Sequence, residues 1–203
     1  MRAKDLIEDN AQLWRAATHH AFLDEVGDGT LDAAAFARWL SQDYHFAVAL
    51  IRSEARALAC APREDLELLV GGIQAMVAEL DWFESKASER EIDLEVELHP
   101  TARAYIDYLR ALADEPYSVQ LTALWALERA YLEGWRTARP GAPAFREFVE
   151  RWTSDAFAAY VDALEAAVNR AIGRGGGAER EVFRWVAKYE EAFWEMAYAR
   201  GDV

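Results

Sequence analysis

Apolar side chains recur along this chain in steps of three and four residues, the spacing that brings residues onto one face of an α-helix. Glycine, proline and capping residues interrupt the pattern and predict where each helix begins and ends. The expected helices cover about 3–25, 30–59 with Thr30 as the cap, 66–90, 101–113, a fifth from a Ser118 cap to the turn at 139–143, 144–172, and a last helix after the glycines at 173–177.

Two segments between these helices resemble a β-strand and a phosphate-binding loop, but each lacks a feature that such a structure needs. Residues 92–98 alternate apolar and polar side chains as a strand does, yet no second alternating segment could pair with them, so we expect an extended loop. The glycines at 173–177 follow no strand and precede no Lys-Ser or Lys-Thr, which indicates a link between helices rather than a phosphate-binding loop. The pattern predicts a single all-α domain over 1–203, a bundle of about seven helices.

Four acidic residues interrupt the apolar rows of three predicted helices. They are Asp43 and Glu54 on the second helix, Glu128 on the fifth and Glu190 on the last. A carboxylate removed from water needs an ion pair, hydrogen bonds or a proton. Each acid alone is equally well explained as a structural partner of an Arg, Trp or Tyr side chain. Four together favour a pocket in which carboxylates from different helices meet.

The composition fits one globular domain, since 53% of the 203 residues are hydrophobic and 12% are aromatic. The formal net charge of -14 opposes nucleic acid and anionic membrane surfaces as partners. No apolar segment approaches the roughly 20 residues that a membrane-spanning helix needs. A single cysteine, Cys60, and the lack of an apolar N-terminal leader favour a cytoplasmic location.

The sequence offers no familiar metal site and no obvious cysteine nucleophile. Di-iron bundles use Glu-x-x-His pairs, but the residues three positions before the four histidines are Ala16, Ala17, Gln42 and Val96. A cage of carboxylates alone is the remaining metal alternative. Cys60 has no histidine near it in sequence, which favours a small boundary thiol. We therefore expect no metal and no cofactor.

The last helix carries Tyr189-Glu190-x-x-Phe193-Trp194-x-Met196-Ala197-Tyr198, which resembles the C-terminal signature of the TenA family, best known for its thiaminase II enzymes. The run Trp-Leu-Ser-Gln-Asp-Tyr at 39–44 resembles the family's Gln-Asp-Tyr segment, and 101–109 resembles its tyrosine-bearing fourth helix. The resemblance covers nearly the whole chain. It implies a heme-oxygenase-like helical bundle and a homo-oligomer, either a dimer or a tetramer.

The resemblance also assigns roles to single positions. Glu190 matches the family's catalytic C-terminal glutamate, Asp43 its pyrimidine-binding aspartate, and Tyr105 a pocket tyrosine. Phe46 and Trp152 stand where other members carry pocket tyrosines. These matches imply a small-molecule pyrimidine as the ligand.

The fifth helix departs from the thiaminase II pattern. The nucleophilic cysteine of those enzymes lies two residues before a tryptophan, and with Trp125 as that tryptophan the position is Ala123. A covalent route through a thiolate is therefore absent. Residues 125–131, Trp-Ala-Leu-Glu-Arg-Ala-Tyr, resemble instead a Cys-less branch with paired glutamates. That branch implies a salvage hydrolase for aminopyrimidine fragments of damaged thiamine.

The implied substrate is 4-amino-5-aminomethyl-2-methylpyrimidine or its formylated relative. Its hydrolysis needs a proton for the leaving nitrogen and a base for water, and we assign Glu190 and Glu128 to these roles.

Asp43 would bind the 4-amino group and a ring nitrogen, and Glu54 would support it from the same helix face. Stacking surfaces would come from Tyr105, Trp125 and Trp152. The alternative is a non-catalytic or redirected protein on the same fold that binds a pyrimidine or another flat heteroaromatic ligand without hydrolysing it.

Overall fold

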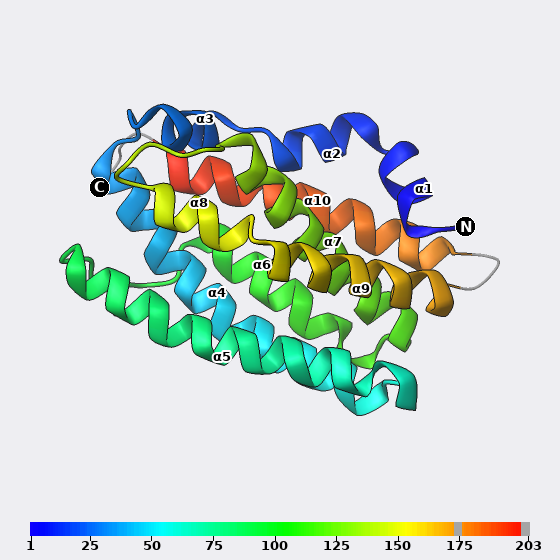
Figure 1. Cartoon of the computed structure of the whole chain (residues 1–203). Helices are drawn as coiled ribbons and strands as arrows, with labels where there is room; N and C mark the ends of the chain where they lie inside the picture. The colour runs from blue at the N-terminus through cyan, green and yellow to red at the C-terminus, as the bar shows by residue number, and fades with distance from the viewer. Residues whose placement is uncertain (173–175, 200–203) are drawn as a thin grey trace. The chain divides into compact units, whose positions relative to one another are not determined.

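The computed structural model describes residues 1–172 and 176–199, which form helices and contain no strand (Figure 1). Two short 3-10 helices lie at Arg63–Asp65 and Leu112–Asp114. The α-helices are α1 (Ala3–Glu8), α2 (Ala11–Thr18), α3 (Ala21–Asp28), α4 (Ala33–Cys60), α5 (Leu66–Glu89), α6 (Pro100–Ala111), α7 (Tyr117–Thr137), α8 (Arg146–Trp152), α9 (Asp155–Ala171) and α10 (Gly177–Tyr198). The predicted all-α class is confirmed. Within this described part, no helix combines the length and apolar character needed to cross a membrane.

The single helix predicted over 3–25 is wrong, because the structure divides this segment into α1, α2 and α3. At the first break the Asn10 side-chain amide donates to the Leu6 carbonyl oxygen at 2.7 Å, a local bond that competes with the helical ladder. At the second break His19 and His20 are extended, and His20 Nδ1 accepts the Phe22 backbone N–H at 3.0 Å. Histidine is not a usual helix cap, so the pattern carried no stop signal there.

The helix predicted over 144–172 is also divided, into α8 and α9. Ser154 is extended, and its Oγ accepts the Phe157 backbone N–H at 3.3 Å, which caps α9. The Thr153 hydroxyl donates to the Val149 carbonyl oxygen at 2.6 Å and accepts from Arg139 Nε at 2.8 Å. Side-chain bonds therefore replace the backbone ladder at this break. Most of the predicted glycine link, at 173–175, lies outside the described residues.

Two predicted helix caps are wrong. α4 is capped by Asp32 rather than Thr30, and the Asp32 carboxylate accepts the Ala34 backbone N–H at 2.9 Å. α7 begins after Pro116 without a side-chain cap. The Ser118 hydroxyl donates instead to Glu179 Oε1 on α10 at 2.7 Å. A tertiary partner thus takes the hydroxyl that the local pattern assigned to a cap.

The chain forms two compact units, each built from segments that are separate in sequence. The first contains Met1–Leu31 and Pro116–Glu195, and the second contains Asp32–Glu115 and the residues from Met196 onwards. In the first unit α7 packs on α2, α3, α8 and α9. In the second, α4 lies beside α5 (Figure 1) and also packs on α6. A single domain over 1–203 stays a prediction.

The core of the first unit is a cluster of aromatic rings that joins α7, α8 and α10. Trp135 and Trp152 have ring centroids 4.8 Å apart, Tyr131 and Trp152 5.3 Å, and Trp135 and Trp194 6.1 Å. Such pairs contribute about 0.5–1.5 kcal/mol each beyond the area they bury. The cluster therefore holds α7 against α10 within this unit.

In the second unit one glutamine fastens the loop that precedes α6. Residues 92–98 contain no strand, as predicted. Gln42 Nε2 on α4 donates to the Glu97 carbonyl oxygen at 2.9 Å, and its Oε1 accepts the His99 backbone N–H at 2.8 Å. Both ends of one amide therefore hold the loop against α4, at the position next to Asp43.

Candidate active site

All four acids that interrupt the apolar rows are buried. Their relative exposures are 8% for Asp43, 1% for Glu54, 4% for Glu128 and 7% for Glu190. Acidic residues are rarely buried to this degree unless neighbouring groups hold them. Glu128 and Glu190 belong to the first unit, and Asp43 and Glu54 to the second. The two pairs are therefore described in turn.

Ring contacts fix how α7 and α10 lie within the first unit. Trp125 of α7 stacks on Phe183 of α10 with centroids 6.0 Å apart and an interplanar angle of 26°. Further along both helices, Tyr131 stacks on Trp194 at 6.3 Å and 14°. Earlier residues contact earlier ones and later residues contact later ones, so the two helices run in the same direction.

The two glutamates of the first unit lie between these ring contacts. Glu128 follows Trp125 by three residues, and Glu190 follows Phe183 by seven and precedes Trp194 by four. Steps of three, four and seven return to the same face of a helix. From this periodicity we expect Glu128 and Glu190 on the facing sides of α7 and α10.

Trp125 is part of a stacked column of three rings. Phe183 stacks on Trp125 and also on Trp14, with the second pair at 5.2 Å and 21°. Trp125 is fully buried, and among the described residues its Nε1–H has no hydrogen-bond partner. A buried donor without a partner costs about 1–3 kcal/mol. One face of the Trp125 ring is thus covered by protein, while its edge carries an unused donor.

Trp152 belongs to the aromatic core of the first unit. Its ring meets Tyr131 edge-on at an interplanar angle of 79° and also contacts Trp135 and Phe148. Tyr131 follows Glu128 by three residues on the same face of α7. Trp152 is therefore one ring away from the helix face that carries Glu128.

In the second unit the predicted pocket residues gather along one side of α4. The rings of Phe46 and Tyr105 have centroids 4.6 Å apart and an interplanar angle of 41°. Asp43 precedes Phe46 by three residues, so it lies on the helix face that meets Tyr105 of α6. Glu54 follows Asp43 by eleven residues, three helical turns along the same face. The structure thus brings Asp43, Phe46 and Tyr105 to one side of α4.

A hydrogen bond on α4 lies directly beside Asp43. The Tyr44 hydroxyl donates to Glu84 Oε1 of α5 at 2.8 Å. This bond, followed by burial, raises the pKa of Tyr44 from its ordinary value of 10.0. The bond ties α4 to α5 as long as the phenol keeps its proton.

Ala123, which the resemblance matches to the thiaminase II cysteine, and its helical neighbour Leu127 are apolar and buried. Ala123 is 2% exposed and Leu127 is 4% exposed, both on α7. Cys60 is exposed and ends α4, in the other unit. Among the described residues, His, Cys, Asp and Glu side chains form no group of three that could hold a metal ion.

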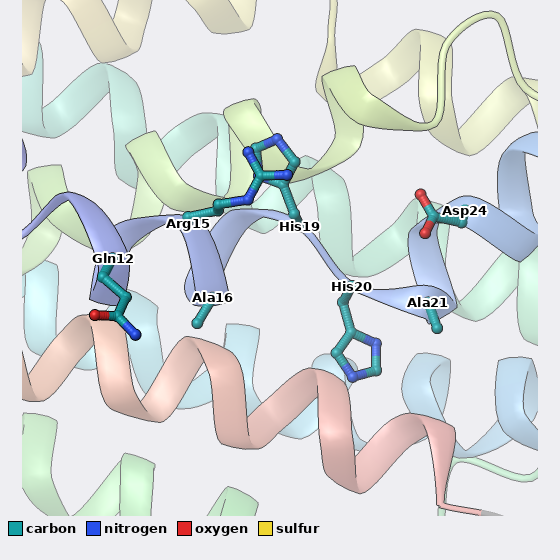
Figure 2. Close-up of a pocket in the computed structure, with 7 residues that line it drawn as sticks. All are labelled: Gln12, Arg15, Ala16, His19, His20, Ala21 and Asp24. Atoms are coloured by element: carbon teal, nitrogen blue, oxygen red, sulfur yellow. The ribbon is translucent and has the colours of Figure 1, made fainter.

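A separate hollow of about 460 Å³ lies on the first unit where α2 ends and α3 begins (Figure 2). In Figure 2 the His20 ring points towards α10, and its Nε2 lies 3.3 Å from Glu195 Oε1. The exposed side chains of Arg15, His19 and Asp24 also line the hollow. None of the predicted site residues is among its lining residues, so we place the candidate site at the buried acids.

Two side chains with clear structural roles carried no site prediction. Phe183 stacks between Trp14 and Trp125, and Gln42 holds the loop beside Asp43. Phe183 stands on the apolar row of Glu190, and Gln42 stands next to Asp43 in the sequence. Periodicity could have marked both as inward-facing, but it cannot separate a core ring from one that supports a site.

The family model described as TENA/THI-4/PQQC family matches residues 8–200. A relative from Glycine max, named "Probable bifunctional TENA-E protein", is 30% identical, and the match covers 94% of this chain and 90% of the relative. An "Aminopyrimidine aminohydrolase" from Halalkalibacterium halodurans is 25% identical over 97% of this chain and 95% of its own length. A solved TenA homologue from Pyrococcus furiosus is 34% identical with a TM-score of 0.92, covering 98% of this chain and all of that one.

Proposed function

The chain belongs to the TENA/THI-4/PQQC family, and we propose that it is a thiamine-salvage hydrolase that acts on an aminopyrimidine. The observation that supports this proposal is the burial of Glu128 and Glu190 on α7 and α10, two helices whose rings stack on each other within one unit. The similarity to a relative named aminopyrimidine aminohydrolase supports the same substrate class. The proposed substrates are 4-amino-5-aminomethyl-2-methylpyrimidine and its N-formyl derivative.

The reaction on the aminomethyl compound replaces a carbon–nitrogen bond by a carbon–oxygen bond. Water attacks the exocyclic methylene carbon as ammonia leaves, and the product is 4-amino-5-hydroxymethyl-2-methylpyrimidine. One glutamate accepts a proton from the water, and the other donates a proton to the leaving nitrogen. Glu128 and Glu190 take these two roles, and the burial of both strengthens their electrostatic action on the reacting atoms.

The remaining residues bind the ring. The Asp43 carboxylate accepts a hydrogen bond from the 4-amino group, and Glu54 supports it from the same face of α4. Tyr105, Trp125 and Trp152 offer aromatic surfaces, and Phe46 lies against Tyr105 at 4.6 Å. Phe46 stands where other family members carry a pocket tyrosine, so this position offers a ring without a hydroxyl.

Cleavage of intact thiamine is not part of the proposed activity. The covalent route needs a thiolate on α7, and the matching position is the buried methyl group of Ala123. We expect the enzyme to act on the free pyrimidine and to leave intact thiamine uncleaved.

The test is to incubate the purified protein with each pyrimidine and identify the products by mass spectrometry. We expect the hydroxymethyl pyrimidine from the aminomethyl substrate, or the deformylated amine from the formyl substrate. Binding of the hydroxymethyl pyrimidine without turnover of either substrate would overturn the hydrolase and favour a pyrimidine-binding protein on this fold.

A further inference from the structure

The indole N–H of Trp125 is a buried donor that the described residues leave unused. Two other buried tryptophans of the same unit satisfy theirs. Trp14 Nε1 donates to Glu133 Oε2 at 2.7 Å, and Trp194 Nε1 donates to the Ala17 carbonyl oxygen at 3.1 Å. Trp135 Nε1 is a second buried indole nitrogen of this unit that makes no hydrogen bond within the described part of the chain, but its ring lies inside the aromatic core, against Trp152 and Trp194. The position of Trp125 needs its own explanation.

That position is beside the two proposed catalytic acids. Trp125 precedes Glu128 by three residues on the same face of α7. Its ring face is occupied by Phe183, on the α10 row that also carries Glu190. A ring that is stacked on one face can still offer its N–H in the ring plane. Trp125 can therefore offer a ligand the N–H at the edge of its ring, whereas Phe183 covers one of its faces.

We propose that the Trp125 indole N–H donates a hydrogen bond to a ring nitrogen of the pyrimidine substrate and so selects for that nitrogen. The inference rests on the proposed function. Ring nitrogens of an aminopyrimidine carry lone pairs in the ring plane and act as acceptors. Of the two proposed catalytic glutamates, the one that acts as base is ionised and only accepts hydrogen bonds, and the other keeps its proton for the leaving nitrogen, so an unprotonated ring nitrogen still needs a donor. Indole supplies the missing donor without adding a charge.

The chemistry predicts a specific discrimination. A buried site that donates to a substrate atom rejects an analogue lacking that acceptor, because the donor then stays unpaired. Two pyridine analogues of 4-amino-5-hydroxymethyl-2-methylpyrimidine each replace one ring nitrogen by CH. We expect one of them to bind roughly ten- to a hundredfold more weakly than the pyrimidine.

Binding of the pyrimidine and both pyridines is measured by calorimetry on the wild type, Trp125→Phe and Trp14→Phe. Trp14→Phe is the matched control, because Trp14 stacks on the other side of Phe183 and its N–H is held by Glu133. We expect the wild type and Trp14→Phe to discriminate. Trp125→Phe should bind the pyrimidine and the disfavoured pyridine within about twofold of each other. Undiminished discrimination by a folded Trp125→Phe protein overturns the proposal.

A second measurement uses the wild-type protein, so it can be made even if the Trp125→Phe variant does not fold. The indole signal of Trp125 in a ¹H–¹⁵N spectrum is identified by its loss in Trp125→Phe or by sequential assignment. Saturating 4-amino-5-hydroxymethyl-2-methylpyrimidine should move this proton downfield and slow its exchange, while the Trp14 signal changes little. If the chemical shift of the Trp125 indole proton stays the same in a protein that binds and turns over pyrimidines, this inference is wrong and the proposed function stands. No pyrimidine binding and no turnover sink the proposed function, and the inference with it.

Discussion

Trp125 of α7 stacks on Phe183 of α10 at 6.0 Å, and Glu128 and Glu190 follow these two rings by three and seven residues on the faces that meet. The spacing of the two acids is therefore tied to an aromatic contact. Rings of this size resist displacement because protein cores are closely packed. A change in the Trp125–Phe183 contact should therefore shift the carboxyl groups of Glu128 and Glu190 and lower the turnover number.

Phe183→Leu tests this coupling. The variant loses ring contacts to Trp125 and Trp14, so we expect urea denaturation to show a loss of roughly 1–3 kcal/mol in the free energy of unfolding. Turnover should fall by about ten- to a hundredfold, the scale of misplacing catalytic groups by about an ångström. Leu6→Ala, at an equally buried side chain of α1 in the same unit, should lose at least as much stability and keep turnover within about threefold. Unchanged turnover in Phe183→Leu would show that the ring contact does not position the acids.

Gln42→Glu should release the loop before α6. The carboxylate can still accept the His99 backbone N–H, but it cannot donate to the Glu97 carbonyl oxygen and would face it with an unpaired charge. We expect a stability loss of about 1–3 kcal/mol and faster proteolysis within 92–98. Ser41→Ala is the control, since the Ser41 hydroxyl donates to the Arg38 carbonyl oxygen of its own helix. Loop cleavage no faster than in the wild type would remove this role from Gln42.

The Tyr44–Glu84 hydrogen bond predicts a difference in alkaline stability. The pKa of Tyr44 is raised in the folded protein, so its contribution is complete below the unfolded value of 10.0 and is lost as pH rises through the folded value. Tyr44→Phe lacks this contribution at every pH. The difference in Tm between wild type and variant should therefore shrink between pH 8 and 11. A constant difference across this range would mean that the bond does not depend on the phenol proton.

Alkylation should leave hydrolysis unchanged. Cys60 is the one cysteine of the sequence, and it is exposed at the end of α4. Complete modification by iodoacetamide, confirmed by mass spectrometry, should lower turnover by less than about twofold, because acid and base groups carry the reaction. Inactivation that Cys60→Ser prevents would point to thiol chemistry and against paired glutamates.

The sequence predicted the fold well where apolar residues recur at helical spacing. Inner rows on α4, α7 and α10 identified buried faces, and Asp43, Glu54, Glu128 and Glu190 are all buried as those rows implied. Helix breaks were missed at Asn10, His20 and Ser154, where single side chains satisfy backbone groups that the ladder would otherwise use. Ser118 failed as a cap because its acceptor, Glu179, is far away in the sequence.

The sequence predicted which site residues face inward and which match the family. It did not predict which of these side chains contact one another. Periodicity assigns a residue to one face of a helix but does not say which helix that face meets. The pairing of Trp125 with Phe183 comes only from tertiary packing. A joint pocket for Asp43, Glu128 and Glu190 stays a prediction, as do the cytoplasmic location and the oligomeric state.

The central claim is that Glu128 and Glu190 hydrolyse an aminopyrimidine by acid and base catalysis. Its most direct test is the turnover number of Glu190→Gln and Glu128→Gln on the substrate that the wild type uses best. Glu195→Gln is the matched control, five residues further along α10 with a side chain that is 68% exposed. We predict losses of about two to four orders of magnitude for the first two variants, with folding retained, and near-normal turnover for the control. Near-normal turnover in a folded Glu190→Gln or Glu128→Gln protein would contradict the paired-glutamate mechanism.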